Sequence, residues 1–147
     1  MKEVNQYFYL AFIVFSSSYL INLLWEVAHS ALYDWNKAPL QNSVYYYIPR
    51  ILYSTLGDAV VIALLFGFLV ILNNGMAWIH MPQAREYAVF VVAGIFFAVL
   101  IELRAMAENR WSYSQYMPVV LGIGLTPLVQ LAVTGLVTLF VVRRLLS

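Results

Sequence analysis

The chain has 147 residues, of which 63% are hydrophobic and only 10% are charged. Soluble domains carry about 25% charged residues, so this composition excludes an ordinary water-soluble domain. The formal net charge of +1 provides no basic surface for nucleic acid, and the absence of cysteine excludes disulfides, thiolate metal sites and cysteine nucleophiles.

Four apolar segments follow one another along the chain, and each approaches or exceeds the roughly 20 residues that a helix needs to cross a bilayer. Lipid offers no partner to backbone polar groups, and the alternation typical of barrel strands is absent, so we expect helices. No small-residue cleavage site follows the first segment, which we expect to be a retained span rather than a signal peptide. The predicted spans are Tyr7–Ala31, Ile51–Leu72, Tyr87–Leu103 and Met117–Val142.

Polar connections separate these spans. Residues 32–50 are expected to form a loop that contains Pro39 and Pro49, residues 73–75 a turn, and residues 109–116 a short loop. Pro118 suits the first turn of the fourth helix. The expected fold is therefore all-α, with one domain over residues 1–147, four transmembrane helices in an up-down bundle, and both termini on one side.

The eight lysines and arginines divide evenly, four on each side of the predicted membrane. Two cations on the side away from the termini, Arg104 and Arg110, lie beside the polar residues described next. If these two serve a site, the terminal side carries the excess of positive charge, and the positive-inside rule then predicts cytoplasmic termini.

The ionisable residues at membrane depth fall in the half of the bundle away from the termini. Glu26 and His29 lie near the end of the first span, Asp58 two turns into the second, and Glu102 near the end of the third. A charged side chain at this depth costs roughly 3 kcal/mol, so these groups should face the interior and find partners. The remaining members of the predicted cluster are Asn22, Tyr33, Glu108, Arg110, Trp111, Tyr113 and Gln130.

Helical spacing supports this grouping. Residues 22, 26, 29 and 33 are separated by four, three and four positions and therefore share one helix face. On the fourth span a small or polar residue recurs every four positions, a pattern that simple helix packing also explains. This stripe consists of Gly122, Thr126, Gln130, Thr134 and Thr138.

Three chemical interpretations fit the cluster. Glu26 and His29 have the spacing by which one helix offers two ligands to a metal, and Asp58 and Glu102 would complete a site for a single divalent ion. The second interpretation is a buried network in which His29 and Arg110 neutralise the carboxylates. We expect Arg110 to pair with one of the three acidic side chains of the spans, because an arginine fork satisfies a carboxylate with two hydrogen bonds. In the third, crowded carboxyl groups retain a proton and act as a general acid.

Four motifs resemble those of a family of small four-helix bacterial integral membrane proteins of unknown function. They are WExxHSxLY at 25–33, GDA at 57–59, ENRWSYSxxMP at 108–118 and GxGLxPLxQ at 122–130. The resemblance implies a four-helix fold and a prokaryotic inner membrane, and it implies no activity.

The leading hypothesis is a small membrane enzyme or binding protein for a lipid, isoprenoid or other apolar molecule. Glu26, Asp58 and Glu102 would be its acid–base or ligand groups, with His29 as proton partner, and the remaining members of the predicted cluster would contact the ligand. An accessory or assembly subunit of a larger membrane complex is the alternative, and a transporter or proton path is the third. A homo-oligomer agrees with the small size of the chain.

Overall fold

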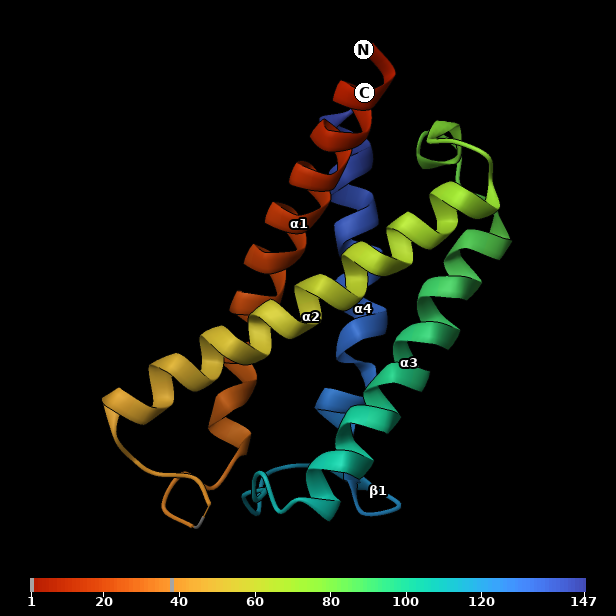
Figure 1. The fold of residues 1–147 in the computed structure, drawn as a ribbon. Coiled ribbons are helices and arrows are strands. Elements are labelled where there is room, and N and C mark those ends of the chain that lie inside the picture. Colours follow the sequence, from red (N-terminus) through yellow and green to blue (C-terminus); the bar gives the residue numbers. More distant parts are fainter. Residues whose placement is uncertain (1, 38) are drawn as a thin grey trace.

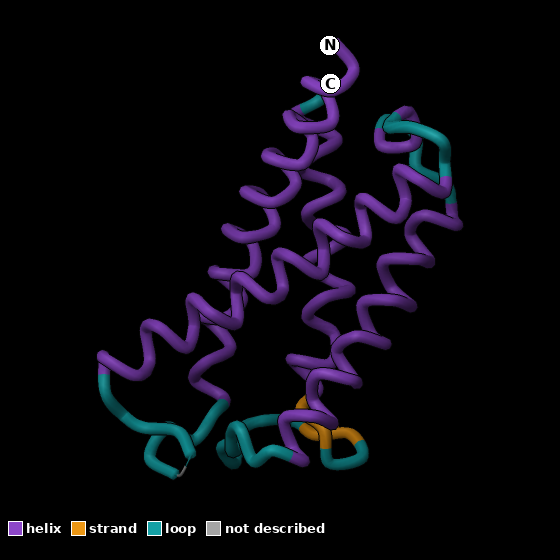
Figure 2. The backbone as a smooth tube through the Cα atoms, in the orientation of Figure 1, coloured by secondary structure: helices purple, strands orange, loops and turns teal. Residues whose placement is uncertain are grey.

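The computed structural model describes residues 2–37 and 39–147, without the side chains of residues 2–4, so the charge of Lys2 lies outside the described part. Four long helices account for most of it (Figures 1 and 2). Each is long and apolar enough to cross a membrane, as expected of a multi-pass membrane protein. The helices are α1 (Lys2–His29), α2 (Val44–Leu72), α3 (Ala84–Ala107) and α4 (Leu125–Leu145).

Large apolar side chains cover the outside of the helices as well as the inside. Phe12, Ile71 and Val92, for example, are 71%, 78% and 68% exposed. Such outward faces suit an apolar surrounding such as lipid. The inward faces pack into a core in which the rings of Phe66 and Phe90 lie 5.1 Å apart. The core occupies the part of the bundle near the chain ends.

The helices pair unequally. α1 packs against α2 and α4, and α3 packs along α4, whereas α2 and α3 contact each other little. Figure 1 shows α2 crossing the molecule obliquely, and it shows the start of α1 and the end of α4 at the same end. The loops that join α1 to α2 and α3 to α4 lie together at the opposite end (Figure 2).

The predicted start of the second helix was wrong. α2 begins at Val44, seven residues before Ile51, and Pro49 lies inside the helix rather than in a loop. The tyrosines at positions 45–47 were interpreted as loop, yet tyrosine is as compatible with a helix end at a membrane interface. Asp58 consequently lies about four turns into α2, not two.

The predicted start of the fourth helix was also wrong. Residues before Leu125 form a hairpin of two short antiparallel strands, β1 (Val119–Val120) and β2 (Ile123–Gly124). Its tight turn has φ of +52° at Leu121 and +82° at Gly122, the left-handed geometry that two-residue hairpins require. Pro118 and Gly122 therefore lie outside α4, and Gly122 does not belong to its polar stripe.

Short 3₁₀ turns follow α1 (η1, Ser30–Leu32) and, at the other end of the bundle, α2 (η2, Ala77–Ile79).

The loop between α1 and α2 and the loop between α3 and α4 are joined by backbone hydrogen bonds. Beyond η1, Tyr33 forms a β-bridge with Tyr113. The amide of Asp34 donates to the carbonyl of Ser112 at 2.9 Å, and the amide of Ser114 donates to Leu32 at 2.9 Å. The loop after α1 is thereby fixed to the loop after α3, which closes one end of the bundle.

The close approach of α3 to α4 yields a first prediction. A Cβ at Gly94 would lie 2.7 Å from the backbone nitrogen of Ala132, whereas a Cβ at Gly67 of α2 would meet nothing within 4 Å. Gly94→Ala should therefore separate α3 from α4 and lower the melting temperature. Gly67→Ala should leave it unchanged or raise it, because alanine favours a helix by about 1 kcal/mol over glycine. Thermal unfolding of both variants in detergent checks this, and equal stability of the two would contradict the packing.

Candidate functional site

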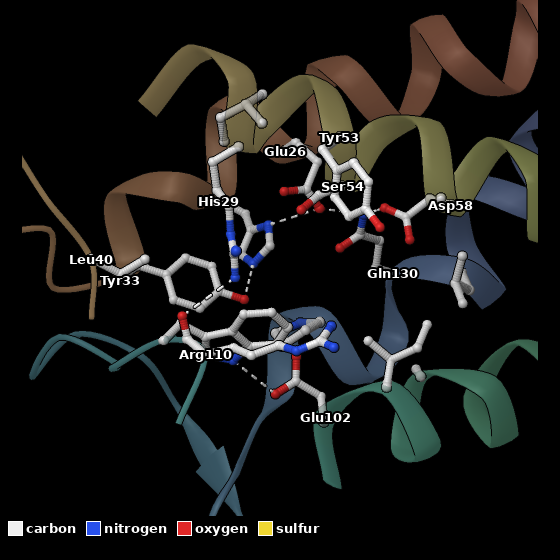
Figure 3. A pocket seen from close by; sticks show the side chains of 18 of the residues that line it. Glu26, His29, Tyr33, Leu40, Tyr53, Ser54, Asp58, Glu102, Arg110 and Gln130 are labelled. Carbon is white, nitrogen blue, oxygen red and sulfur yellow. Dashed lines mark hydrogen bonds and ion pairs between the residues drawn. The ribbon is translucent and has the colours of Figure 1, made fainter. Parts of the chain in front are cut away.

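A cavity of about 240 Å³ lies between the helices near the end closed by the loops (Figure 3). All four helices and both loops contribute to its wall. Eight of the predicted site residues line it: Glu26, His29, Tyr33, Asp58, Glu102, Arg110, Trp111 and Gln130. The other three do not, since Asn22 lies behind Gln130, Tyr113 behind Glu102, and Glu108 outside.

Gln130 of α4 joins the polar groups of three helices. Its amide nitrogen donates to Glu26 of α1 at 2.8 Å and to Asp58 of α2 at 2.6 Å. The oxygen of Asn22 lies farther away, at 3.4 Å. Figure 3 shows the Gln130 side chain directed between the two carboxyl groups. One amide group therefore serves two carboxyl groups that come from different helices and approach each other closely.

His29 lies one turn beyond Glu26 and is 94% buried, with a relative exposure of 6%. Its Nε2 is 3.1 Å from the hydroxyl of Tyr33, and its Nδ1 is 3.9 Å from a Glu26 oxygen, with no hydrogen-bond partner in the described part of the chain. Tyr33 follows η1 and is not on α1, so the predicted continuous helix face ends at His29. The three side chains nevertheless form a row from the interior to the loops.

Glu102 of α3 forms a separate part of the cavity wall. It accepts hydrogen bonds from the indole nitrogen of Trp111 at 3.3 Å and from the hydroxyl of Tyr113. Burial and this hydrogen bond raise the pKa of Tyr113 to about 12, so the phenol remains a donor at neutral pH. Glu102 thus has two donors of its own, unlike Glu26 and Asp58, which share one amide.

The predicted partner of Arg110 was wrong. Arg110 pairs with Glu108, which also binds Arg104 across one helical turn. Glu108 is two residues from Arg110, so this pair forms without ordering any further segment. These two arginines hold the pKa of Glu108 below its usual value. Arg110 still lines the cavity, but its guanidinium pairs with Glu108 rather than with a carboxyl group of the cavity.

Arg50 was missed because residues 32–50 were interpreted as a loop. Its Nη2 donates to the carbonyl oxygen of Arg110 at 3.3 Å, and its guanidinium lies over the Trp111 ring, 5.5 Å from the centroid. Arg50, Ser54 and Asp58 recur every four residues and line the same cavity. That spacing would have revealed Arg50 and Ser54 if the helix had been extended to Val44. The other lining residues are Trp35, Leu40, Ile51, Tyr53, Gly57, Val61, Ala98, Ile101, Pro127 and Leu131.

The remaining polar stripe of α4 serves packing. Thr134 and Thr138 are buried, and each hydroxyl donates to the carbonyl oxygen four residues earlier in the same helix. Thr126 donates to the sulfur of Met117. Among the described residues, no three His, Asp or Glu side chains are placed to hold a metal ion together.

Comparison of the chain with protein-family models, with curated proteins and with solved structures finds no match. Inferences about its function therefore rest on the residues themselves.

The different partners of Glu102 and Asp58 yield a second prediction. Glu102→Gln replaces the carboxyl acceptor of two hydrogen bonds by a weaker amide oxygen and should lower the free energy of unfolding by about 1 to 2 kcal/mol. Asp58→Asn keeps an oxygen for the Gln130 amide and removes a negative charge beside Glu26, so its stability should equal or exceed that of the wild type. Melting curves in detergent compare the variants. A larger loss for Asp58→Asn than for Glu102→Gln would show that Asp58 is a structural charge.

Proposed function

We propose that the protein is a small membrane-embedded enzyme that performs acid–base chemistry on a lipid-soluble molecule. The observation that carries this proposal is the placement of the Glu26 and Asp58 carboxyl groups on one donor, the Gln130 amide, at the wall of a cavity. A cluster that only stabilises the fold does not require two acidic groups on one hydrogen-bond donor. The repulsion between two such groups is a strain of the kind that is found at functional sites.

Two neighbouring carboxyl groups suit general acid–base catalysis. Like charges so close together repel, and a proton shared between the groups removes that repulsion. The protonated member of the pair, Glu26 or Asp58, can then donate to a substrate while the ionised member accepts a proton. Glu102 has its own donors and acts in this proposal as a fixed part of the wall.

His29 and Tyr33 provide a route by which the pair can exchange protons with water at the loop end. The imidazole Nδ1 faces a Glu26 oxygen at 3.9 Å, a gap that a small shift or one water molecule closes, and Nε2 reaches Tyr33 at 3.1 Å. Tyr33 belongs to the loop region outside the helices. Histidine is the usual side chain for such transfer because both nitrogens can carry the proton.

The walls of the cavity indicate an apolar substrate. Val61 of α2, Ala98 and Ile101 of α3, and Leu131 of α4 lie beside the polar groups. The limited contact between α2 and α3 leaves this side of the bundle facing lipid. A lipid, isoprenoid or similar molecule can reach the acidic pair from the bilayer without crossing water.

The same proposal includes the membrane arrangement. We infer an up-down bundle in a prokaryotic inner membrane, with both termini in the cytoplasm and the loop end with the cavity facing outward. The position of both chain ends at one end of the bundle supports placing the two termini on the same side of the membrane. The excess of lysines and arginines on that side, when Arg104 and Arg110 are left out of the count, supports a cytoplasmic location of the termini.

The third prediction tests this arrangement. The chain has no cysteine, so a single cysteine introduced by mutation is the only residue of the protein that a maleimide labels. Ser147→Cys and Met81→Cys should react with a membrane-impermeant maleimide only after cells are permeabilised, because both lie at the terminal end. Asn42→Cys, in the loop before α2, should react with intact cells. Labelling of residues 147 and 42 from the same side would contradict the four-span topology.

The fourth prediction tests the chemistry. Asp58→Asn removes one member of the acidic pair, so the variant should retain substrate that the wild type converts and releases. Mass spectrometry of organic extracts from the two purified proteins should find a lipid-soluble molecule enriched in the variant. Arg144→Gln, at the far end of α4, provides a matched control.

Infrared spectroscopy supplies an independent measurement for the same variants. The wild type at neutral pH should show the carbonyl band of a protonated carboxyl group, which Asp58→Asn or Glu26→Gln removes and Glu102→Gln leaves. Identical extracts from all the proteins, together with no such band, would contradict the enzyme and favour an accessory subunit of a membrane complex.

A further inference from the structure

We propose that the ligand of this cavity is a single-chain amphiphile with an anionic group, a phosphate or a carboxylate, and that Arg50 binds that group. This inference rests on the proposed function, since it names the substrate class of the same site. The cavity has a cation at its loop end and the acidic pair deeper in the bundle, and such a polarity matches a molecule whose anionic head lies at the membrane interface.

Arg50 differs from the other arginines that lie at or near the loops between the helices. Arg85 pairs with Glu86, and both Arg104 and Arg110 pair with Glu108. Within the described residues Arg50 has no such carboxylate partner. Its direct contacts are one hydrogen bond to a backbone carbonyl and the face of Trp111, and the charge of Glu26 acts on it from a longer distance. Among the described residues, Arg50 is therefore the cavity cation that no carboxylate contacts directly.

No carboxyl group of the cavity forms an ion pair with Arg50 in the described part of the chain, and each binds other donors instead. Glu26 and Asp58 bind the Gln130 amide, and Glu102 binds Trp111 and Tyr113. The Trp111 ring holds the guanidinium by one face, which leaves its N–H edge for a further acceptor. Phosphate and carboxylate are the acceptors that a planar guanidinium binds best.

Room for the apolar chain lies along α2 and α3. Gly57 lines the cavity one residue before Asp58, and a Cβ there would meet nothing within 4 Å. Ala98 and Ile101 form the opposite wall on α3. A chain that runs from Arg50 along Gly57 passes the acidic pair and leaves toward lipid between the two helices. The reacting carbon would then lie a few bonds from the anionic head.

A cationic amphiphile fits less well. An ammonium head at the loop end would lie near Arg50 and be repelled by that cation rather than bound by it. An uncharged amphiphile offers Arg50 no charged acceptor. The position of Arg50 at the loop end of the cavity therefore favours an anionic head there.

The fifth prediction measures binding of four probes with the same dodecyl chain: dodecyl phosphate, dodecanoate, dodecanol and dodecylamine. Native mass spectrometry of the protein in a non-ionic detergent gives the dissociation constant of each. The wild type should bind an anionic probe about tenfold or more tighter than dodecanol, as a charge-assisted hydrogen bond implies. Preference for the phosphate alone identifies a phosphate head, and equal affinity for phosphate and carboxylate identifies recognition by charge.

Variants assign the preference to Arg50. Arg50→Gln should reduce binding of the anionic probes to the level of dodecanol, Arg50→Lys should retain part of the preference, and Arg144→Gln should retain all of it. Gly57→Leu should weaken all four probes, because its side chain occupies the space for the chain. Melting curves verify folding, and if Arg50→Gln does not fold, the comparison with Arg50→Lys decides.

Two results would overturn this inference. They are equal affinity of the wild type for all four probes, and a preference for dodecylamine. Its failure is distinguishable from failure of the proposed function, because Asp58→Asn does not touch the head site. If Asp58→Asn accumulates a neutral lipid and no anionic probe is preferred, the enzyme proposal stands and this inference fails. If Arg50 governs anionic binding and Asp58→Asn accumulates nothing, the reverse holds.

Discussion

The amide group of Gln130 is the point on which the polar half of this protein depends. A carboxyl group among lipid-facing helices must find its partner inside the bundle, and here α4 supplies one donor group for acidic residues of both α1 and α2. One side chain therefore joins three helices at this depth. Glu102 needs no share in this arrangement, because its donors come from the loop that follows its own helix.

The oblique path of α2 follows from this constraint. Asp58 lies at the middle of a helix of 29 residues, whereas Glu26 lies three residues from the end of α1. The oblique crossing of α2 shown in Figure 1 brings the two together at Gln130. That crossing keeps α2 close to α1 and away from most of α3, which accounts for both the cavity and its apolar wall.

Features that depend on a pattern over many residues, such as a membrane-spanning helix, are predicted well from the sequence. Features that depend on competition between nearby alternatives, such as a helix start or the partner of one arginine, are predicted poorly. The four helices and the grouping of Glu26, His29 and Asp58 near one end followed from length, depth and helical spacing. The start of α2 was missed because tyrosines and Pro49 are typical of both loops and helix ends. Arg110 was assigned to the wrong partner because a carboxylate two residues away competes with those across the bundle. No feature of the sequence distinguishes these alternatives without the backbone.

The apolar core beneath Gln130 has an electrical consequence. Thr134 and Thr138 bond to their own helix, and the core around Phe66 and Phe90 has few polar groups, so the half of the bundle near the chain ends acts as an insulator. In an energised membrane the voltage falls across such an insulating layer rather than across a polar cavity. In the enzyme that we propose, Glu26 and Asp58 therefore lie close to the electrical potential of the compartment beside the loops. Their proton exchange would follow the acidity of that compartment and would be nearly independent of the membrane voltage.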